Sequence, residues 1–255
     1  MPRYPARYTS SFSFGPGPVS STLKALIGAN VALFFAQKLA PFWAATGTDL
    51  LTGTLGLMPE AVIGQLWVWQ LCTYMFLHGG LLHILFNMLA LWMFGAELER
   101  VWGTRYFLKF YFVTGIGAAA LTVLFSLLPF AFAQQLRYSI VIGASGAIYG
   151  LLLAYALYFP DRPIYLYMIV PIPAKYFVMI LGGIAFYYSL DGAGGVANAT
   201  HLGGLVVGYL YLKGGRLHPL SGLKYRFLKW RIDRTRRKFD VYSGGRANDW
   251  DGRVH

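Results

Sequence analysis

The sequence is poor in charged residues. Only 13% of its 255 residues are Asp, Glu, Lys or Arg, whereas soluble proteins average about a quarter. Hydrophobic residues make up 56%, and the 18 Tyr and 19 Phe outnumber the 22 basic and 10 acidic side chains together. This composition excludes a water-soluble globular domain. It also excludes an intrinsically disordered chain, because disorder requires low hydrophobicity.

The sequence also has few residues that could form disulfides or bind metal ions inside the apolar stretches. A single Cys excludes a disulfide framework and a Cys-based zinc cluster. We expect that residue, Cys72, to be inert packing, since no base is spaced to activate it. No Asp or Glu lies in the interior of a long apolar stretch. The sequence therefore predicts neither a metal site nor another cofactor.

Six apolar stretches, each close to the roughly 20 residues that cross a bilayer, predict an all-α membrane protein with a six-span helical bundle. They cover residues 23–43, 77–96, 106–128, 140–159, 174–190 and 196–212. The first is interrupted by Gln37 and Lys38, and a cleaved signal peptide is the alternative for it; the long polar lead favours a retained span. The apolar segment Pro160–Pro173 contains four prolines, so we predict an interfacial loop there. Residues 44–76 are predicted to form a long outside loop at the membrane interface.

Basic residues are concentrated at the C-terminal end, where residues 213–255 carry +8 of the net charge of +12. With the N-terminus inside, every Lys and Arg except Lys38 and Arg137 falls in a cytoplasmic segment, as the positive-inside rule requires. We therefore predict that both termini are cytoplasmic. The tail could instead bind anionic lipid or nucleic acid, but nothing in it resembles a nucleic-acid module. The predicted domains are a flexible lead over 1–21, a six-span core over 22–213 and a basic tail over 214–255.

Several strongly polar residues fall in or beside predicted spans, where they are costly and indicate function. They are His78, His83 and Asn87 in the second stretch, Ser145 in the fourth, and Asn198 and His201 in the sixth. The second, fourth and sixth spans run in the same direction. His83, Ser145 and His201 each lie five or six residues into their span, so they are predicted to share one depth in the outer leaflet.

Small residues accompany these polar groups. Gly146-x-x-x-Gly150 and Gly204-x-x-x-Gly208 are patterns that let helix backbones approach closely in membranes. A hydrogen bond of about 3 Å between a Ser and a His on different helices requires such an approach. We therefore expect the glycines to bring Ser145 and its helix close to the helix of His201.

Three motifs together resemble those of the rhomboid intramembrane serine proteases, over about residues 20–212. They are Gly143-Ala144-Ser145-Gly146 followed by Tyr149, Ala199-Thr200-His201 followed by Gly204 and Gly208, and His83-Ile84-Leu85-Phe86-Asn87 preceded by His78. The resemblance implies that Ser145 is the nucleophile and His201 the base. It further implies that His83, Asn87 and the Ser145 backbone N–H stabilise the oxyanion. Trp69-Gln70 stands where the family often has Trp-Arg.

The same resemblance implies supporting roles for four residues. Gly143 would leave the site open, Tyr149 would pack against the catalytic imidazole, and His78 and Asn198 would help to hold water. These roles agree with elementary chemistry, because a Ser hydroxyl needs a base to remove its proton and the oxyanion needs hydrogen-bond donors. The implied partners are transmembrane protein substrates and lipids, and the expected location is a bacterial cytoplasmic membrane.

Two other functions compete with proteolysis. A transporter or proton pathway built on the same histidines predicts polar groups in both leaflets and carboxylates inside spans. A rhomboid relative that binds membrane proteins without cutting them would be expected to lack Ser145 or His201, and both are present. Other intramembrane protease chemistries are excluded, because the sequence has no H-E-x-x-H motif and no pair of aspartates inside spans.

Overall fold

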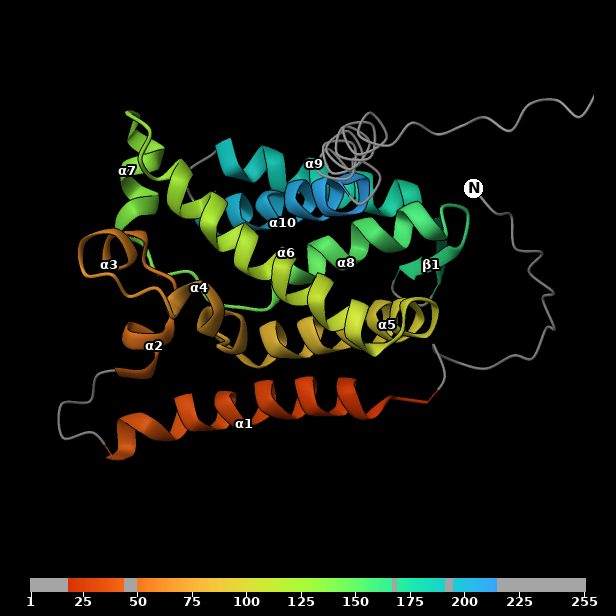
Figure 1. Ribbon diagram of the computed structural model, residues 1–255, viewed down its shortest axis with the longest axis horizontal. Coiled ribbons are helices and arrows are strands. Elements are labelled where there is room, and N and C mark those ends of the chain that lie inside the picture. The colour runs from red at the N-terminus through yellow and green to blue at the C-terminus, as the bar shows by residue number, and fades with distance from the viewer. Residues whose placement is uncertain (1–17, 44–49, 167–168, 191–194, 215–255) are drawn as a thin grey trace, which may run out of the picture. The chain divides into compact units, whose positions relative to one another are not determined.

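Six long helices dominate the computed structural model, which describes residues 18–43, 50–166, 169–190 and 195–214. They are α1 (Ser21–Trp43), α5 (Leu81–Trp102), α6 (Thr104–Phe125), α8 (Ser145–Tyr158), α9 (Ala174–Leu190) and α10 (Gly195–Gly214) (Figure 1). Residues 1–212 form one compact unit. Most of the predicted lead and tail, residues 1–17 and 215–255, lies outside the described residues.

Three of the described helices are long and apolar enough to cross a bilayer. These are α1 over Ser21–Ala40, α5 and α6. The chain is therefore a mostly helical protein of the membrane type. Helix α8 has 14 residues, which at 1.5 Å per residue is about 21 Å, less than the roughly 30 Å hydrocarbon core.

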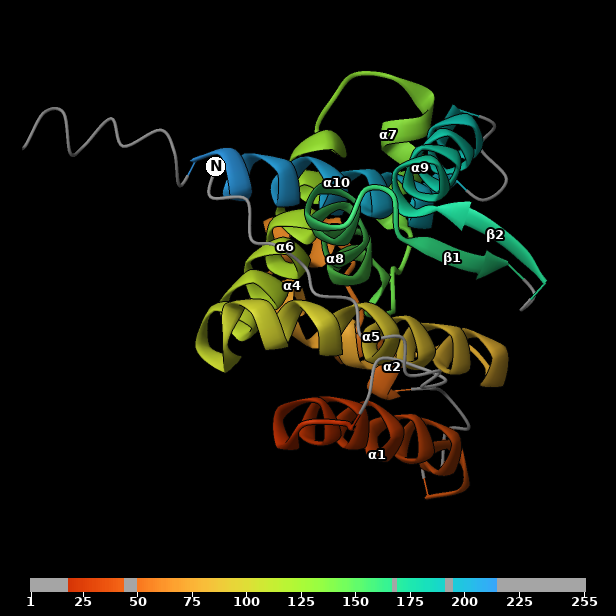
Figure 2. The ribbon, with the colours of Figure 1, turned by 90° about the vertical axis from the view of Figure 1, so that its right-hand side faces the viewer.

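Helix α8 is the central element and packs against α5, α6 and α9 (Figures 1 and 2). Its sequence, SGAIYGLLLAYALY, is apolar on all sides, which is typical of a helix surrounded by others. Nine of its residues are buried, namely Gly146, Ala147, Ile148, Gly150, Leu151, Leu152, Ala154, Tyr155 and Ala156. The first residue of this enclosed helix is Ser145.

Glycine contacts hold α8 close to α10. A Cβ atom built on Gly204 would overlap the carbonyl oxygen of Gly146, and one on Gly208 would lie 3.2 Å from the Gly150 Cα atom. The prediction that the two small-residue patterns allow close helix approach is confirmed.

The predicted span boundaries around 97–109 are wrong. Helix α5 continues to Trp102 and α6 begins at Thr104, so a single residue, Gly103, joins them. Its φ of 77° lies in the left-handed region that favours glycine at helix ends. Charged residues marked the edge of the apolar stretch, whereas the helices continue past that edge.

The charged end of α5 is stable as a helix because its carboxylates have partners. Glu99 is buried and accepts hydrogen bonds from the hydroxyls of Ser20, at 2.5 Å, and Thr104, at 2.7 Å. Glu97 accepts a hydrogen bond of 2.7 Å from the guanidinium of Arg162. Such hydrogen bonds offset the free-energy cost of burying a carboxylate.

Two further predictions need correction. The segment 160–173, predicted as a loop of an all-α protein, contains an antiparallel hairpin of β1 (Pro163–Leu166) and β2 (Val170–Pro173). Pro163 and Pro173 pair with each other at the end of the two strands, and Pro171 lies opposite Tyr165 in this two-stranded sheet, where both strands are edge strands that tolerate proline. The fourth stretch, predicted from residue 140, becomes helical only at Ser145, because Val141 forms a backbone bridge with Leu57 instead.

The long connection before α5 is folded rather than irregular. Its described part contains the short helices α2 (Leu50–Leu55), α3 (Pro59–Gly64), α4 (Gln70–Thr73) and a 3₁₀ turn, η1 (Tyr74–Phe76). A further short helix, α7 (Ala131–Tyr138), follows α6, and Arg137 of α7 forms an ion pair with Glu60 of α3. The first loop is thus attached to the segment that leads into α8.

The Gly204 contact predicts a local stability effect. In Gly204→Ala the new methyl group meets the α8 backbone, which has no flexible end to move, so we expect a loss of about 1–3 kcal/mol in unfolding free energy. Gly183→Ala is the matched control, because no heavy atom lies within 4 Å of its Cβ position, and alanine favours a helix over glycine by up to about 1 kcal/mol. Thermal unfolding in detergent compares the two. Equal midpoints would contradict the packing argument.

Candidate active site

Ser145 and His201 lie within hydrogen-bonding distance. Ser145 opens α8, His201 lies on α10, and the Ser145 Oγ and His201 Nε2 atoms are 2.7 Å apart across 56 residues of sequence. The approach is possible because Gly204, one turn further along α10, packs directly on Gly146. The structure thus brings together the two residues that the sequence pairs.

The His201 ring is held by stacking rather than by a carboxylate. The Tyr149 ring lies parallel to it, with centroids 4.4 Å apart and an interplanar angle of 6°. The Nδ1 atom of His201 has no hydrogen-bond partner in the described part of the chain. The preceding residue, Thr200, shares a 2.9 Å hydrogen bond with Thr122 of α6, which fixes the same turn. With its proton on Nδ1, a neutral imidazole can accept the Ser145 hydroxyl proton at Nε2.

Gly143 separates His83 from Ser145 without filling the space between them. A Cβ atom on Gly143 would lie 2.8 Å from His83 Nε2 and 3.6 Å from Ser145 Oγ. The φ of Gly143 is 125°, a conformation that side chains of L-residues rarely adopt. Backbone geometry and space therefore both require glycine here, and the open position faces His83 and Ser145 together.

The elements that carry Ser145 and His83 also carry hydrogen-bond donors. The first backbone N–H groups of α8 have no acceptor within the helix, and they carry the positive end of the helix dipole. Asn87 of α5 is buried and its Nδ2 donates to the His83 carbonyl at 2.7 Å, which leaves a second N–H on the same amide. Such donors stabilise negative charge that develops on a carbonyl oxygen beside Ser145.

His78 packs against His83 and is fully buried. The two imidazole rings meet edge to face, with centroids 5.0 Å apart. Neither ring nitrogen of His78 has a hydrogen-bond partner among the described residues. Asn198 is half-buried on α10, near His201 in sequence, and its role in holding water stays a prediction.

Two buried polar residues, to which the sequence pattern assigned no role in the site, hold the segments around it. One is Tyr74, which is fully buried; its hydroxyl donates to the Gly115 carbonyl at 2.8 Å, and its own carbonyl accepts the Gly143 N–H at 2.9 Å. Tyr74 therefore fixes the turn that carries Gly143. A tyrosine among many others in an aromatic-rich chain gave no signal of this role.

The other residue is Gln70, also fully buried. Its Oε1 accepts the Met58 N–H at 3.0 Å, and its Nε2 donates to the carbonyls of Gly53 and Thr54 at 3.4 and 3.3 Å. Trp69 Nε1 donates to the same Thr54 carbonyl at 2.9 Å. The Gln that replaces the family's usual Arg thus connects α4 with the first part of the loop.

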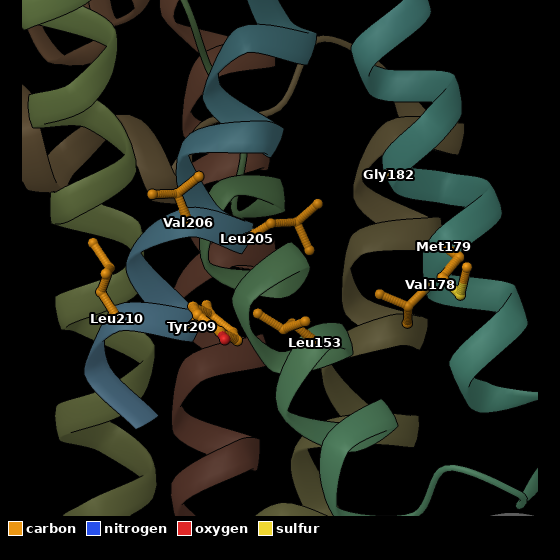
Figure 3. A pocket seen from close by; sticks show the side chains of 8 residues that line it. All are labelled: Leu153, Val178, Met179, Gly182, Leu205, Val206, Tyr209 and Leu210. Atoms are coloured by element: carbon orange, nitrogen blue, oxygen red, sulfur yellow. The ribbon is translucent and has the colours of Figure 1, made fainter. Parts of the chain in front are cut away.

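An apolar groove of about 400 Å³ lies elsewhere, between α8, α9 and α10 (Figure 3). Its lining contains neither Ser145 nor His201, and it consists of Leu153, Val178, Met179, Gly182, Leu205, Val206, Tyr209 and Leu210. Tyr209 is the only lining residue with a polar side-chain group. Within the described segments, no three His, Cys, Asp or Glu side chains form a cluster that could hold a metal ion.

Comparisons with known proteins point to one family. The model of the Rhomboid domain matches residues 65–215, a range that contains every residue of the site. The chain is 31% identical over 185 residues to the Rhomboid protease GluP of Bacillus subtilis, covering 72% of this chain and 32% of that protein. It is 31% identical over 194 residues to the mitochondrial Rhomboid protein 1 of Saccharomyces cerevisiae, covering 73% and 51%.

A third relative is matched over more of its length. The Rhomboid protease AarA of Providencia stuartii is 28% identical over 220 residues, covering 81% of this chain and 76% of that protein. The alignments with the other two relatives span only about a third and a half of those proteins. Because the family model matches more than half of the sequence, this chain belongs to the rhomboid family.

Proposed function

We propose that this chain is an intramembrane serine endopeptidase that uses a Ser145–His201 dyad to cut membrane proteins in or near their transmembrane helices. The observation that carries the proposal is the 2.7 Å contact between Ser145 Oγ and His201 Nε2, with Tyr149 stacked on the imidazole. Membership of a family with named proteases supports the same reaction class. The proposal involves no metal, cofactor or nucleic acid.

The reaction follows from the geometry of the dyad. His201 Nε2 takes the Ser145 hydroxyl proton as the Oγ atom attacks the peptide carbonyl carbon. The resulting oxyanion is stabilised by His83, Asn87 and the Ser145 backbone N–H. His201 then gives its proton to the leaving amine, and the Ser145 acyl ester remains. Water, activated by the same imidazole, hydrolyses this ester and restores the hydroxyl.

We further propose that all six long helices span the membrane, with both termini in the cytoplasm. The distribution of basic residues supports this arrangement. In it, Ser145 opens a helix of only 14 residues and lies below the outer surface, where water must reach it. We assign the protein to a bacterial cytoplasmic membrane, which the relatives from Bacillus subtilis and Providencia stuartii support. The division into a lead, a core and a basic tail belongs to the same proposal.

A transporter built on the same histidines receives less support. His78, His83 and His201 gather around one point beside Ser145, and the described carboxylates of α5 lie near its cytoplasmic end in the proposed topology. A pathway across the membrane would need polar groups along the whole distance. A non-cutting relative is disfavoured because Ser145 and His201 are both present and in contact.

Helix α9 is the proposed moving element through which a substrate helix reaches the dyad. Its buried side chains are Ala174, Val178, Ala185 and Ser189, and it packs against α8 and the hairpin. The apolar groove lies between α9 and α10 (Figure 3). The glycine-rich sequence DGAGG at 191–195 favours a hinge at the end of α9, and residues 191–194 lie outside the described part of the chain.

The dyad can be tested in purified, detergent-solubilised protein with a fluorophosphonate probe, which labels an activated serine. We expect wild type to be labelled, and Ser145→Ala and His201→Ala to fall to background while their thermal unfolding stays cooperative. The reason is that, among the described residues, His201 is the base in hydrogen-bond contact with Ser145 Oγ. Labelling of Ser145→Ala equal to wild type, or a His201→Ala variant with a tenth or more of the rate, would refute the dyad.

The oxyanion donors predict a graded effect. Asn87→Ala removes one side-chain donor and leaves the dyad intact, so turnover should fall by about 10²–10³, the usual loss for one such donor. Turnover of a reporter substrate is measured beside unfolding, because the same change removes the Asn87 hydrogen bond to the His83 carbonyl. Turnover within threefold of wild type would exclude Asn87 from transition-state stabilisation.

The buried position of Ser145 also predicts a substrate preference. A helix hides its peptide carbonyls in hydrogen bonds, so it must unwind locally before attack, and Gly or Pro makes unwinding easier. We expect single-span substrates to be cut near their outer end, beside small residues. Replacing Gly and Pro of a cleavable reporter span by Leu should abolish cutting, as mapped by mass spectrometry. Efficient cleavage of the all-Leu span, or a cut in its cytoplasmic half, would overturn this preference.

A further inference from the structure

The two polar residues that interrupt the first apolar stretch both contact the segment that leads into α5. Gln37 is buried on α1; its Oε1 accepts the backbone N–H of His78 at 2.9 Å, and its Nε2 donates to Thr52 Oγ1 at 2.9 Å. The neighbouring Lys38 Nζ donates to the Gly79 carbonyl at 3.3 Å. The backbone just before α5 is therefore held from α1 at two consecutive residues.

This backbone in turn controls the ring of His83. The Gly79 N–H donates to His83 Nδ1 at 3.3 Å. A backbone N–H can only donate, so Nδ1 must be the unprotonated nitrogen of the neutral ring, and Nε2 carries the proton. Nε2 is the atom that faces the open position at Gly143, beside Ser145. The N–H that would stabilise an oxyanion thus points to the correct place only while Gly79 keeps its position.

A side-chain amide suits this bridging position. It offers an acceptor for the His78 N–H and a donor for Thr52 at the same time, and an apolar residue offers neither. Without Gln37 the buried His78 N–H loses its acceptor, and the Leu77–His78 peptide that carries it is free to rotate toward another partner. That rotation changes the backbone angles of His78 and so turns the next peptide, which carries the Gly79 N–H. Any such rotation moves the Gly79 N–H away from His83 Nδ1.

We propose that Gln37 is a positioning residue for transition-state stabilisation: through the His78–Gly79 backbone it holds His83 as the tautomer with its proton on Nε2. The inference rests on the proposed function, because it assigns a role within that reaction. It also gives a reason for the polar interruption of the first span. A residue that merely attached α1 to the loop would act on stability alone.

The test is a double-mutant cycle with Gln37→Met, which keeps the size of the side chain and removes both hydrogen bonds. In wild type we expect kcat to fall about tenfold with KM unchanged, less than the roughly 10²–10³ for a donor lost outright. In a His83→Ala background the same substitution should change kcat less than twofold, because the group that it positions is gone. An equal loss in both backgrounds would overturn the proposal.

Two matched variants separate positioning from attachment. Thr52→Val breaks the loop arm of Gln37, leaves the arm to His78 intact, and should leave kcat within twofold of wild type. Asn30→Leu removes another buried polar side chain of α1, whose Nδ2 donates only within the helix, to Leu26, and it should also leave kcat unchanged. A tenfold loss in Thr52→Val would assign the effect to the loop and refute a role through His78.

A measurement without turnover decides the point independently of proteolysis. ¹⁵N NMR of histidine-labelled protein reports which imidazole nitrogen carries the proton. We expect a single tautomer protonated at Nε2 for His83 in wild type and in Asn30→Leu, and a mixture in Gln37→Met. An unchanged His83 signal in Gln37→Met would refute the proposal. If wild type cut no substrate in a Ser145-dependent way, the proposed function would fail, and the tautomer would still show whether Gln37 positions His83.

Discussion

The contact of Gly146 on α8 with Gly204 on α10 is the constraint on which the site depends. It lets the two helices approach until the Ser145 Oγ and His201 Nε2 atoms are 2.7 Å apart. In a membrane, where lipid competes equally for apolar side chains, close backbone packing is the main attraction between helices. The same glycines that remove side chains from the interface therefore supply the stability of the pair and its chemistry.

Segments outside the long helices position the turn of Gly143 and the start of α8. Tyr74 holds the turn of Gly143, and Leu57 pairs with Val141 in the segment before α8. Gln37 and Gln70 give the buried backbone of this region its hydrogen-bond partners. Because an unsatisfied polar group is costly in a water-poor interior, these contacts fix the loop as firmly as a helix would be fixed. The first loop is thus part of the structure that positions the reacting groups.

The sequence predicted the features that depend on local pattern. The long apolar helices, the glycine contacts of Gly204 and the spacing of Ser145 and His201 all follow from periodicity or motif. It could not predict that α5 runs through Glu99, because the partners of that carboxylate, Ser20 and Thr104, are visible only in three dimensions. Full burial of His78 and Gln70 was hidden for the same reason, since composition reports polarity and not enclosure.

The single-residue link at Gly103 has a mechanical consequence. It joins α5 directly to α6, and at the same corner Glu99 accepts hydrogen bonds from Ser20, the residue before α1, and from Thr104, the first residue of α6. These contacts therefore hold the adjoining ends of α1, α5 and α6 together. Helix α9, by contrast, packs against α8 and the hairpin and borders an apolar groove. In the proposed mechanism the oxyanion donors His83 and Asn87 therefore stand on the helix that these contacts hold, and a substrate helix displaces α9, which takes no part in that corner.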